Sequence, residues 1–507
     1  MASKFKALIF DLGGVLLDWD PQSVKAVTST QLRTIMHSTT WHELDRGNLS
    51  LDQACELFSV IIGVESSIIK ESLDQAQKSL TVNVRLARIA QELKESDPNL
   101  QLYVMSNISR EHFEIVQNLD LPWSIFTSAF ASGNVGMRKP DLCFFEHVID
   151  KIGMHPSQVV MVDDQAENLC AAQSLGIHGL LVDETSVDIV SQKLRNLFQS
   201  SIPRAEAYMK ANARNHNCVV EGHNITLKDN FAQFLIWELT GDADIIYFKW
   251  PSGKLHPAQN PGNSNGKTGA SLKANVKNGL WNYFYEDPIL TTQDFPADAD
   301  TTSTAYLSLP PDYLSEVADV HLILDKMAFN MSPDGIMQTY FCDDRPRTAP
   351  EVCSNMLRLF YRFGRGGDPR IRKTADWVVK CLNNRACLYG NRVYSTPETF
   401  LYFTARLYLE CGEGNLKKRL EPIKEALLER INAPTNPLAL ALRISACKLV
   451  GIDPLIYQQD LERLMSLQEE DGGFPAGHFC CFGRTGARIG NRGLTTALTL
   501  KIIRHDV

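Results

Sequence analysis

Two patterns of hydrophobic and polar residues divide the chain. Up to about residue 185, short apolar runs alternate with segments whose apolar residues have helical spacing; the runs are KALIF, LQLYVMSN, VVMVDD and GLLV. This alternation is typical of a parallel α/β sheet. Residues of roughly 20–95 contain helical patterns and no strong strand, which predicts a helical cap inserted into the α/β domain.

After residue 205, apolar residues recur at helical spacing in each long segment. The segments are NFAQFLIWELT, SNMLRLFYRF, PETFLYFTARLYLE, PLALALRISACKLV and LTTALTLKII. They predict an all-α second domain. Pro203 lies in a mixed segment between the two patterns, and a proline there indicates a junction. We therefore expect an α/β domain over 1–200 and an all-α domain over 201–507.

The composition argues against nucleic acid as a binding partner. A net charge of -8 and a pI near 5.9 leave no broad cationic surface for a nucleic-acid backbone. The apolar run near the N-terminus is far shorter than a signal peptide or a membrane span, so we expect a cytoplasmic protein without stable membrane insertion. The 12 cysteines form no CxxC pair, which favours reduced thiols. The sequence does not indicate an oligomeric state.

Polar residues follow the predicted strands of the first domain. They are Asp11 before the glycine turn Gly13-Gly14, Ser106-Asn107, Lys139 in GMRKPD, and Asp163-Asp164. Such sheets bind ligands at the carboxyl edge of their strands, so these side chains are expected to converge on one point.

In this order, the set resembles the haloacid-dehalogenase-like phosphatase superfamily over essentially the whole first domain. The resemblance implies a Rossmann-like fold in which Asp11 attacks phosphorus. It also implies that Ser106 and Asn107 hold phosphate oxygens and that Lys139 neutralises the nucleophile and the phosphate. Mg²⁺ would be bound by Asp11, the Gly13 carbonyl and Asp164, with Asp163 supporting the site. Oxygen ligands suit this hard cation.

One position departs from the superfamily pattern. Gly13 stands where the usual motif has a second aspartate, the general acid. Expelling a phosphate monoester needs little protonation, whereas expelling an alkoxide needs a proton. We therefore expect the site to remove the terminal phosphate of a diphosphate more readily than the last phosphate. Asp18 or Asp20 could supply the missing acid.

The stretch DADTTS contains two carboxylates one residue apart, Asp298 and Asp300. A helix N-cap explains such a pattern, whereas a calcium loop is disfavoured because no glycine and downstream glutamate follow at EF-hand spacing. Acid catalysis is a further interpretation, since a buried, neutral carboxylic acid can protonate a carbon-carbon double bond. Asp300 would then donate the proton, and Asp298 and Thr301 would orient it.

DADTTS resembles the Asp-x-Asp-Thr-Thr-Ser variant of the class II terpene cyclase motif. QEEDGGF resembles the Gln/Trp-type repeat of such cyclases, with Phe474 in place of tryptophan. The resemblance implies a single all-α barrel, the β-type domain of class II cyclases. In CDDRPRT, Arg347 stands where a class I synthase would have its third acid, so protonation is favoured over ionisation of the diphosphate.

Further residues are candidates for binding the substrate. Aromatic faces stabilise carbocations, but ordinary core packing explains any one ring equally well; the candidate rings are Trp281, Tyr283, Phe284 and Tyr285. Candidate cations for the diphosphate are Lys249, Arg345, Arg347 and Arg392. A Gly/Asn/Lys-rich stretch is predicted to be a long loop, whose lysines either attract an anion or are simply solvated; they are Lys254, Lys267, Lys273 and Lys277.

The pairing resembles fused phosphatase-like/terpene-cyclase enzymes that make drimane-type bicyclic sesquiterpenes. It implies protonation of farnesyl diphosphate, closure of two rings to a drimenyl- or albicanyl-type diphosphate, and full or partial dephosphorylation. Two alternatives stay open. The first half could be a non-hydrolytic scaffold, so that the diphosphate is released, or the whole chain could be a non-catalytic prenyl-diphosphate binding module.

Overall fold

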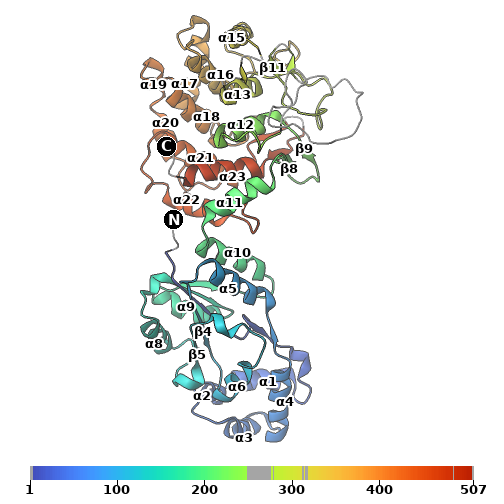
Figure 1. Ribbon diagram of the computed structural model, residues 1–507, viewed down its shortest axis with the longest axis vertical. Coiled ribbons are helices and arrows are strands. Elements are labelled where there is room, and N and C mark those ends of the chain that lie inside the picture. The colour runs from blue at the N-terminus through green and yellow to red at the C-terminus, as the bar shows by residue number, and fades with distance from the viewer. Residues whose placement is uncertain are drawn as a thin grey trace. The chain divides into compact units, whose positions relative to one another are not determined.

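The computed structural model describes residues 4–247, 276–277, 279–310, 313–314, 318–482 and 485–504. The chain divides into two compact units, Met1–Ser200 and Ser201–Val507. No hydrophobic cluster is shared between them among the described residues. In Figure 1 the first unit runs from blue to green and the second from green to red.

The first unit is built on a five-stranded parallel sheet of order β5-β4-β1-β6-β7. The strands are β1 (Ala7–Phe10), β4 (Gln101–Ser106), β5 (Ser128–Ala131), β6 (Val159–Asp163) and β7 (His178–Leu181). Alternate residues of β1 enter two different cores, because successive side chains of a strand point to opposite faces. Leu8 and Phe10 pack with α5 (Val84–Ser96) and α10 (Val187–Phe198); the other core contains α8 (Leu142–Ile152) and α9 (Ala166–Ser174).

The predicted parallel α/β fold is confirmed, with one strand added. Strand β5 has the sequence SAFA, and its serine and alanines give no strong apolar run. It lies at the edge of the sheet beside β4. The other short elements around the sheet are η2 (Trp123–Ile125), η3 (Pro156–Gln158), α6 (Arg110–Val116) and α7 (Ser132–Val135).

Four helices between β1 and β4 form a separate cluster with its own small core around Ile35, Phe58 and Ile69. They are α1 (Ser29–Met36), α2 (Thr39–Asp45), α3 (Leu51–Ile62) and α4 (Ser66–Lys78). A two-stranded antiparallel ribbon, β2 (Leu17–Asp18) and β3 (Thr81–Val82), connects this cluster to the sheet domain, and η1 (Pro21–Ser23) follows β2. These helices are the cap.

The second unit contains a closed ring of six helices among the described residues. Each packs against the next, and the last packs against the first. In order they are α12 (Asn230–Thr240), α13 (Ala299–Ser308), α16 (Pro350–Arg362), α18 (Pro397–Glu410), α21 (Pro437–Leu449) and α23 (Arg492–Ile503). Five of the six contain the apolar segments recognised in the sequence. These segments stood out because their apolar residues recur at helical spacing.

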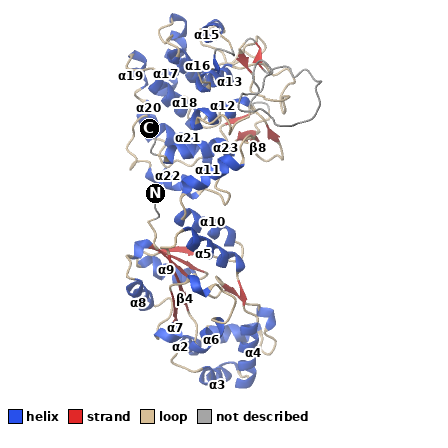
Figure 2. Ribbon diagram, viewed as in Figure 1, coloured by secondary structure: helices blue, strands red, loops and turns tan. Residues whose placement is uncertain are grey.

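Outer helices cover this ring (Figures 1 and 2). They are α11 (Ser201–Ala211), α15 (Val320–Phe329), α17 (Arg372–Asn383) after η5 (Pro369–Ile371), α19 (Asn415–Leu420), α20 (Ile423–Leu428) and α22 (Gln458–Ser466). Pro203 falls in the first turn of α11, where a proline is tolerated because its missing N–H would have no partner.

The second unit is mostly helical but not purely so. A four-stranded antiparallel sheet contains β9 (Thr226–Leu227), β8 (Cys218–Val220), β13 (Arg488–Gly490) and β12 (Cys480–Cys481), and β10 (Val276–Lys277) pairs with β11 (Leu280–Trp281). Strands of two or three residues are too short to give an alternating pattern, so the sequence did not reveal them.

The QEEDGGF segment fastens the outer helix α11 to the barrel. The buried Gln468 amide donates to the carbonyls of Ser201 (3.0 Å) and Gly472 (2.9 Å). Gly472 has φ +87°, and a side chain there would meet the Arg204 carbonyl at 2.2 Å. Phe474 is fully buried. The segment therefore has a structural role.

Candidate active sites

Lys139 is the centre of the polar cluster at the edge of the parallel sheet. Its side chain is fully buried, and Nζ lies 2.8 Å from Asp11 Oδ2 and 2.6 Å from Asp163 Oδ2. Asn107 holds the backbone of Lys139 from both sides: its amide nitrogen donates to the Lys139 carbonyl (2.8 Å), and its oxygen accepts from the Lys139 N–H (2.7 Å). The Asn107 side chain thus positions the lysine.

Three carboxylates of this cluster could hold a cation. Asp11, Asp163 and Asp164 each offer an oxygen, and these atoms lie within 4.8 Å of one another. Gly14, with φ +71°, allows the turn after Gly13 to approach Asp164; a side chain at Gly14 would meet Asp164 Oδ2 at 2.6 Å. A donor set made only of oxygen fits a hard divalent ion such as Mg²⁺.

Asp163 is largely occupied within the protein. Besides Lys139, it accepts hydrogen bonds from the Gln165 N–H and the Asn168 amide, both at 2.9 Å. Burial raises the pKa of Asp11 to about 6, although Lys139 opposes this shift. Burial alone would lower the pKa of Lys139, but Asp11 and Asp163 raise it. Lys139 therefore stays charged, and Ser106, also buried, ends β4 beside Asp11.

The paired aspartates of the second unit open α13. Asp298 is the N-cap, and its Oδ1 accepts from the Thr301 N–H (2.6 Å). Asp300 lies in the first turn and is 4% exposed. Its Oδ1 accepts from the Asn355 amide (2.7 Å), and its Oδ2 accepts from the Tyr394 hydroxyl. The N-cap interpretation is therefore right for Asp298, and it leaves the Asp300 side chain available for chemistry.

The electrostatics of this pair favour protonated carboxyls. Burial raises the pKa of Asp300 to about 6, while the hydrogen bonds from Tyr394 and Asn355 lower it. Burial also raises the pKa of Asp298 to about 7, and the nearby Asp300 contributes to that shift. Thr301 contacts Asp298 through its backbone, whereas Asn355 and Tyr394 orient Asp300.

Sequence reasoning missed the residues that surround Asp300. Glu351, one turn before Asn355 on α16, is fully buried, and burial raises its pKa to about 8. Its Oε2 accepts from the Asn391 amide (2.7 Å), and the Asn391 oxygen accepts from the Tyr394 N–H (2.8 Å). The available signal was the i, i+4 spacing of Glu351 and Asn355, which places both side chains on one face of a helix.

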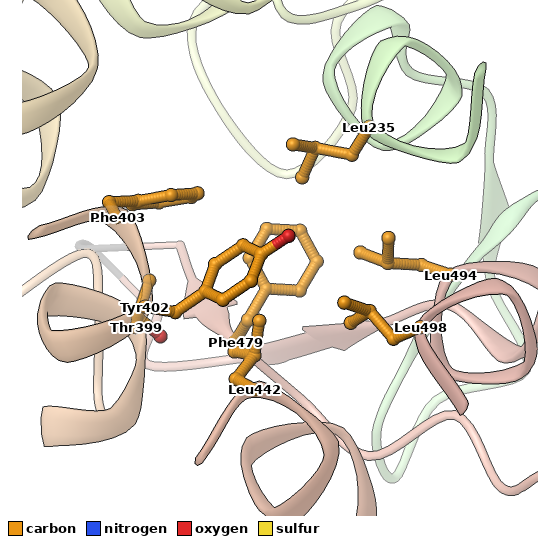
Figure 3. Close-up of a pocket in the computed structure, with 8 residues that line it drawn as sticks. All are labelled: Leu235, Thr399, Tyr402, Phe403, Leu442, Phe479, Leu494 and Leu498. Carbon is orange, nitrogen blue, oxygen red and sulfur yellow. The ribbon is translucent and has the colours of Figure 1, made fainter. Parts of the chain in front are cut away.

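A small apolar pocket is lined by side chains from four of the ring helices, α12, α18, α21 and α23. Figure 3 shows leucines of α12 and α23 facing aromatic side chains of α18 across it; the lining residues are Leu235, Thr399, Tyr402, Phe403, Leu442, Phe479, Leu494 and Leu498. The ring of Phe403 is 6.3 Å from that of Tyr394, which donates to Asp300. The acid and the pocket are thus joined by two neighbouring aromatic rings.

The predicted aromatic residues have different surroundings. Trp281 is fully buried edge-on to Phe234 (4.9 Å), and its backbone N–H donates to the Thr302 hydroxyl of α13 (2.9 Å). Tyr283 packs on Phe284 at 5.0 Å. Tyr285 packs on Tyr247 at 4.8 Å. Trp281 and Tyr285 therefore have the environment of ordinary core residues.

Phe284 belongs to a row of rings that reaches the arginines. It lies 5.1 Å from Phe295, which lies 5.7 Å from Tyr340. Arg345 sits over both of these last rings, at 4.9 Å and 5.6 Å, and Arg347 lies 6.0 Å from Tyr340. The backbone of Tyr340 bridges to that of Asp298. Both arginines are therefore on the side of the barrel where α13 begins.

The remaining predicted cations are only partly described. Arg392 is exposed and precedes Tyr394 by two residues. Lys249, Lys254, Lys267 and Lys273 lie outside the described residues, and only the backbone of Lys277 is described. Within the described residues, no helix combines the length and the apolar character that a bilayer-spanning helix needs.

Two family models match the chain. Residues 8–182 match the haloacid dehalogenase-like hydrolases, and residues 202–363 match the sesquiterpene cyclase astC-like C-terminal domain. Among solved structures, the HAD family enzyme bt-2542 from Bacteroides thetaiotaomicron is 21% identical, with a TM-score of 0.31, covering 36% of this chain and 97% of that chain.

Two curated relatives match the chain at higher identity. The sesquiterpene phosphatase astK of Aspergillus oryzae is 37% identical over 180 residues, which are 36% of this chain and 91% of that protein. The drimenol cyclase drtB of Aspergillus calidoustus is 35% identical over 502 residues, covering 98% of this chain and 88% of that protein. The predicted pairing is confirmed: the chain belongs to the family of fused haloacid-dehalogenase-like/sesquiterpene cyclase enzymes that includes drimenol cyclase drtB.

Proposed function

We propose that this enzyme protonates farnesyl diphosphate, closes two rings to a drimenyl- or albicanyl-type diphosphate, and removes phosphate in its first unit. The observation that carries the cyclase half is Asp300: a buried carboxyl with a raised pKa, which Tyr394 and Phe403 connect to an apolar pocket. A carboxyl whose pKa is raised toward neutrality keeps a protonated fraction that can act as an acid where water is excluded.

The acid step uses the hydrogen bonds around Asp300. When Asp300 gives its proton to the terminal alkene, a carboxylate is left in a buried site. Tyr394 and Asn355 each donate to one of its oxygens, so they stabilise that charge as it develops. The carbocation then faces aromatic side chains such as Phe403 and Phe479, whose π-faces attract a cation without removing its proton.

The diphosphate is expected at the end of the barrel where α13 begins. Arg345, Arg347 and Arg392 lie near that end, and neither Arg345 nor Arg347 forms an ion pair within the part of the chain that the structure describes. The last turns of α16 and α18 also carry arginines, but these are already paired. Glu238 of α12 binds both Arg358 and Arg406, and Arg358 also lies 3.2 Å from Glu410. These cations are already neutralised by buried carboxylates, which disfavours an anion there.

The phosphatase half would use Asp11 as nucleophile and Lys139 to neutralise the charge. Mg²⁺ would be held by Asp11, Asp164 and the Gly13 carbonyl, with Asp163 beside them; when bound, it would supply charge stabilisation to the phosphoryl group. Asn107 keeps Lys139 in place, and Ser106 remains a candidate for a phosphate oxygen. We propose the cytoplasm as the location of the enzyme.

Product analysis with farnesyl diphosphate and Mg²⁺ tests both halves. Wild type should give a bicyclic product and free phosphate. Asp300→Asn should give no cyclised product, and cyclised product from that variant would refute the assignment of the acid. Asp11→Asn should still cyclise but release no phosphate. Equal phosphate release by wild type and Asp11→Asn would favour the non-hydrolytic scaffold, and absence of any conversion would favour a binding module.

A further inference from the structure

The phosphatase site has a buried carboxyl that the proposed mechanism does not use. Asp45 ends cap helix α2, and its side chain is 5% exposed. Its nearest described partner is Arg138, whose Nη2 lies 3.6 Å from Asp45 Oδ2. Arg138 directly precedes Lys139, which contacts Asp11. Burial raises the pKa of Asp45 to about 7, and the Asp11 charge adds a smaller contribution to this shift.

The end of α2 is held firmly against the sheet domain. The Ser132 hydroxyl donates to the Asp45 carbonyl at 2.6 Å, and Arg46 pairs with Asp141 at 2.6 Å. The following turn is in close contact with the sheet domain, because a side chain on Gly47 would meet the Gly133 carbonyl at 2.4 Å. Three separate contacts therefore fix the end of α2 on the sheet domain. They hold Asp45 beside Arg138, in the segment that carries Lys139.

We propose that Asp45 is the general acid of the phosphatase site, in the role that position 13 leaves empty. As Asp11 attacks phosphorus and the bond to the leaving oxygen breaks, the Asp45 carboxyl gives its proton to that oxygen. The Asp45 carboxylate then takes a proton from the water that attacks the aspartyl phosphate. Inorganic phosphate leaves, and both aspartates return to their starting forms.

Asp45 suits this role better than the two residues expected from the sequence. Asp18 and Asp20 are exposed, and Asp20 is used to cap η1 through the Gln22 N–H (2.9 Å). A catalytic acid works best with a pKa near the working pH, and burial shifts the pKa of a carboxyl in that direction. The three groups whose charges act on Asp45 are Arg138, Arg46 and Asp11.

The test compares two substrates whose leaving groups differ in their need for a proton, and it rests on the proposed phosphatase activity. A p-nitrophenolate leaves without a proton, whereas an alkoxide needs one. Asp45→Asn should therefore lower kcat/KM for a long-chain alkyl monophosphate by about 10²- to 10⁴-fold, but for p-nitrophenyl phosphate by less than about 10-fold. Asp141→Asn is the matched control: it weakens the same cap contact, leaves the Asp45 carboxyl in place, and should change both substrates by one common factor.

Each outcome has a separate meaning. If Asp45→Asn affects both substrates equally, or neither, Asp45 is not the acid. If wild type hydrolyses p-nitrophenyl phosphate but no alkyl monophosphate, no step needs this acid and the inference also fails. If wild type hydrolyses neither, the proposed phosphatase activity itself fails. Wild type alone gives a second measurement: across aryl phosphates, its kcat/KM should depend only weakly on the pKa of the leaving group, and a steep dependence would contradict the role of Asp45.

Discussion

At the scale of single residues, the cyclase site depends on how one carboxyl is solvated. Asp298 and Asp300 are chemically identical and two residues apart, yet they have different partners. Asp298 uses an oxygen to cap α13, whereas both oxygens of Asp300 accept side-chain hydrogen bonds. Those bonds make Asp300 a stronger acid than burial alone would allow, because they favour its charged form.

Removing the Tyr394 hydroxyl should weaken this acid. In Tyr394→Phe, the carboxylate of Asp300 loses a donor, so its pKa rises and proton transfer to the alkene slows. We expect cyclisation to fall about 10- to 100-fold, the effect of a hydrogen bond to a charged group. The pH above which Asp300 is deprotonated and cyclisation is lost should therefore rise. Tyr389→Phe, at a residue that is 93% exposed, is the control; an unchanged pH profile in Tyr394→Phe would contradict the assignment.

Replacing Asp298 should stabilise the fold at high pH. Its pKa of about 7 in the folded protein lies above the ordinary value of 3.8, so the free energy of unfolding falls as pH rises from about 4 to 7. Asparagine also caps helices but cannot ionise. Asp298→Asn should therefore match wild type near pH 4 and be more stable by about 1–3 kcal/mol at pH 8. Urea unfolding across this pH range measures it, and a variant less stable at pH 8 would argue against a buried, titrating Asp298.

At the scale of elements, α16 and the segment before α18 form one support for the acid. Helix α16 carries Asn355 and Glu351, and the segment carries Asn391 and Tyr394. Glu351 joins the two by its bond from Asn391, one turn of helix away from Asn355. We infer that Glu351 is a positioning residue, because it holds the segment that presents the Tyr394 hydroxyl to Asp300.

Glutamine should replace Glu351 with little loss. The raised pKa of Glu351, about 8, means that it is mostly neutral at pH 7, and glutamine keeps an acceptor for Asn391. We expect cyclisation by Glu351→Gln to stay within a few-fold of wild type. Glu351→Ala should lose about 10-fold or more, because it removes the hydrogen bond that joins this segment to α16. Initial rates of bicyclic product decide this. If Glu351→Gln is as impaired as Glu351→Ala, the proton of Glu351 itself is required.

At the scale of the whole molecule, two units with separate cores carry two kinds of chemistry. The α/β unit gathers its polar groups at one edge of a sheet, whereas the barrel encloses an apolar pocket. Units with independent cores can unfold independently.

Added Mg²⁺ should stabilise only the first unit. A ligand that binds the folded state raises its stability in proportion to the logarithm of its concentration. Differential scanning calorimetry should resolve two transitions, of which millimolar Mg²⁺ raises one and a chelator lowers the same one. Asp164→Asn should abolish this shift without changing the other transition. A shift of both transitions would mean that the cation does not bind in the first unit alone. A shift of neither would mean that Mg²⁺ does not bind the folded protein.

Much of this fold follows from local pattern. The strands that lead to Asp11, Ser106 and Asp163 are continuous apolar runs, and five barrel helices carry apolar residues at helical spacing. Strand β5 and the short strands of the second unit were missed, because runs of two to four residues carry too little periodicity. The site residues that were missed, such as Tyr394 and Asn355, lie 94 and 55 residues from Asp300, so no local spacing could connect them.

The sequence by itself determined which residue types enter each site: the acids and the serine at the ends of strands, the lysine in the turn before α8, and the aspartate pair that opens a helix. Spacing along the chain sets these because they sit at the ends of regular elements. Only the tertiary structure decided which carboxyls are buried and what touches them. Burial and hydrogen bonding depend on side chains brought together from distant segments, and these contacts separate Asp300 from Asp298 and single out Asp45 in the cap.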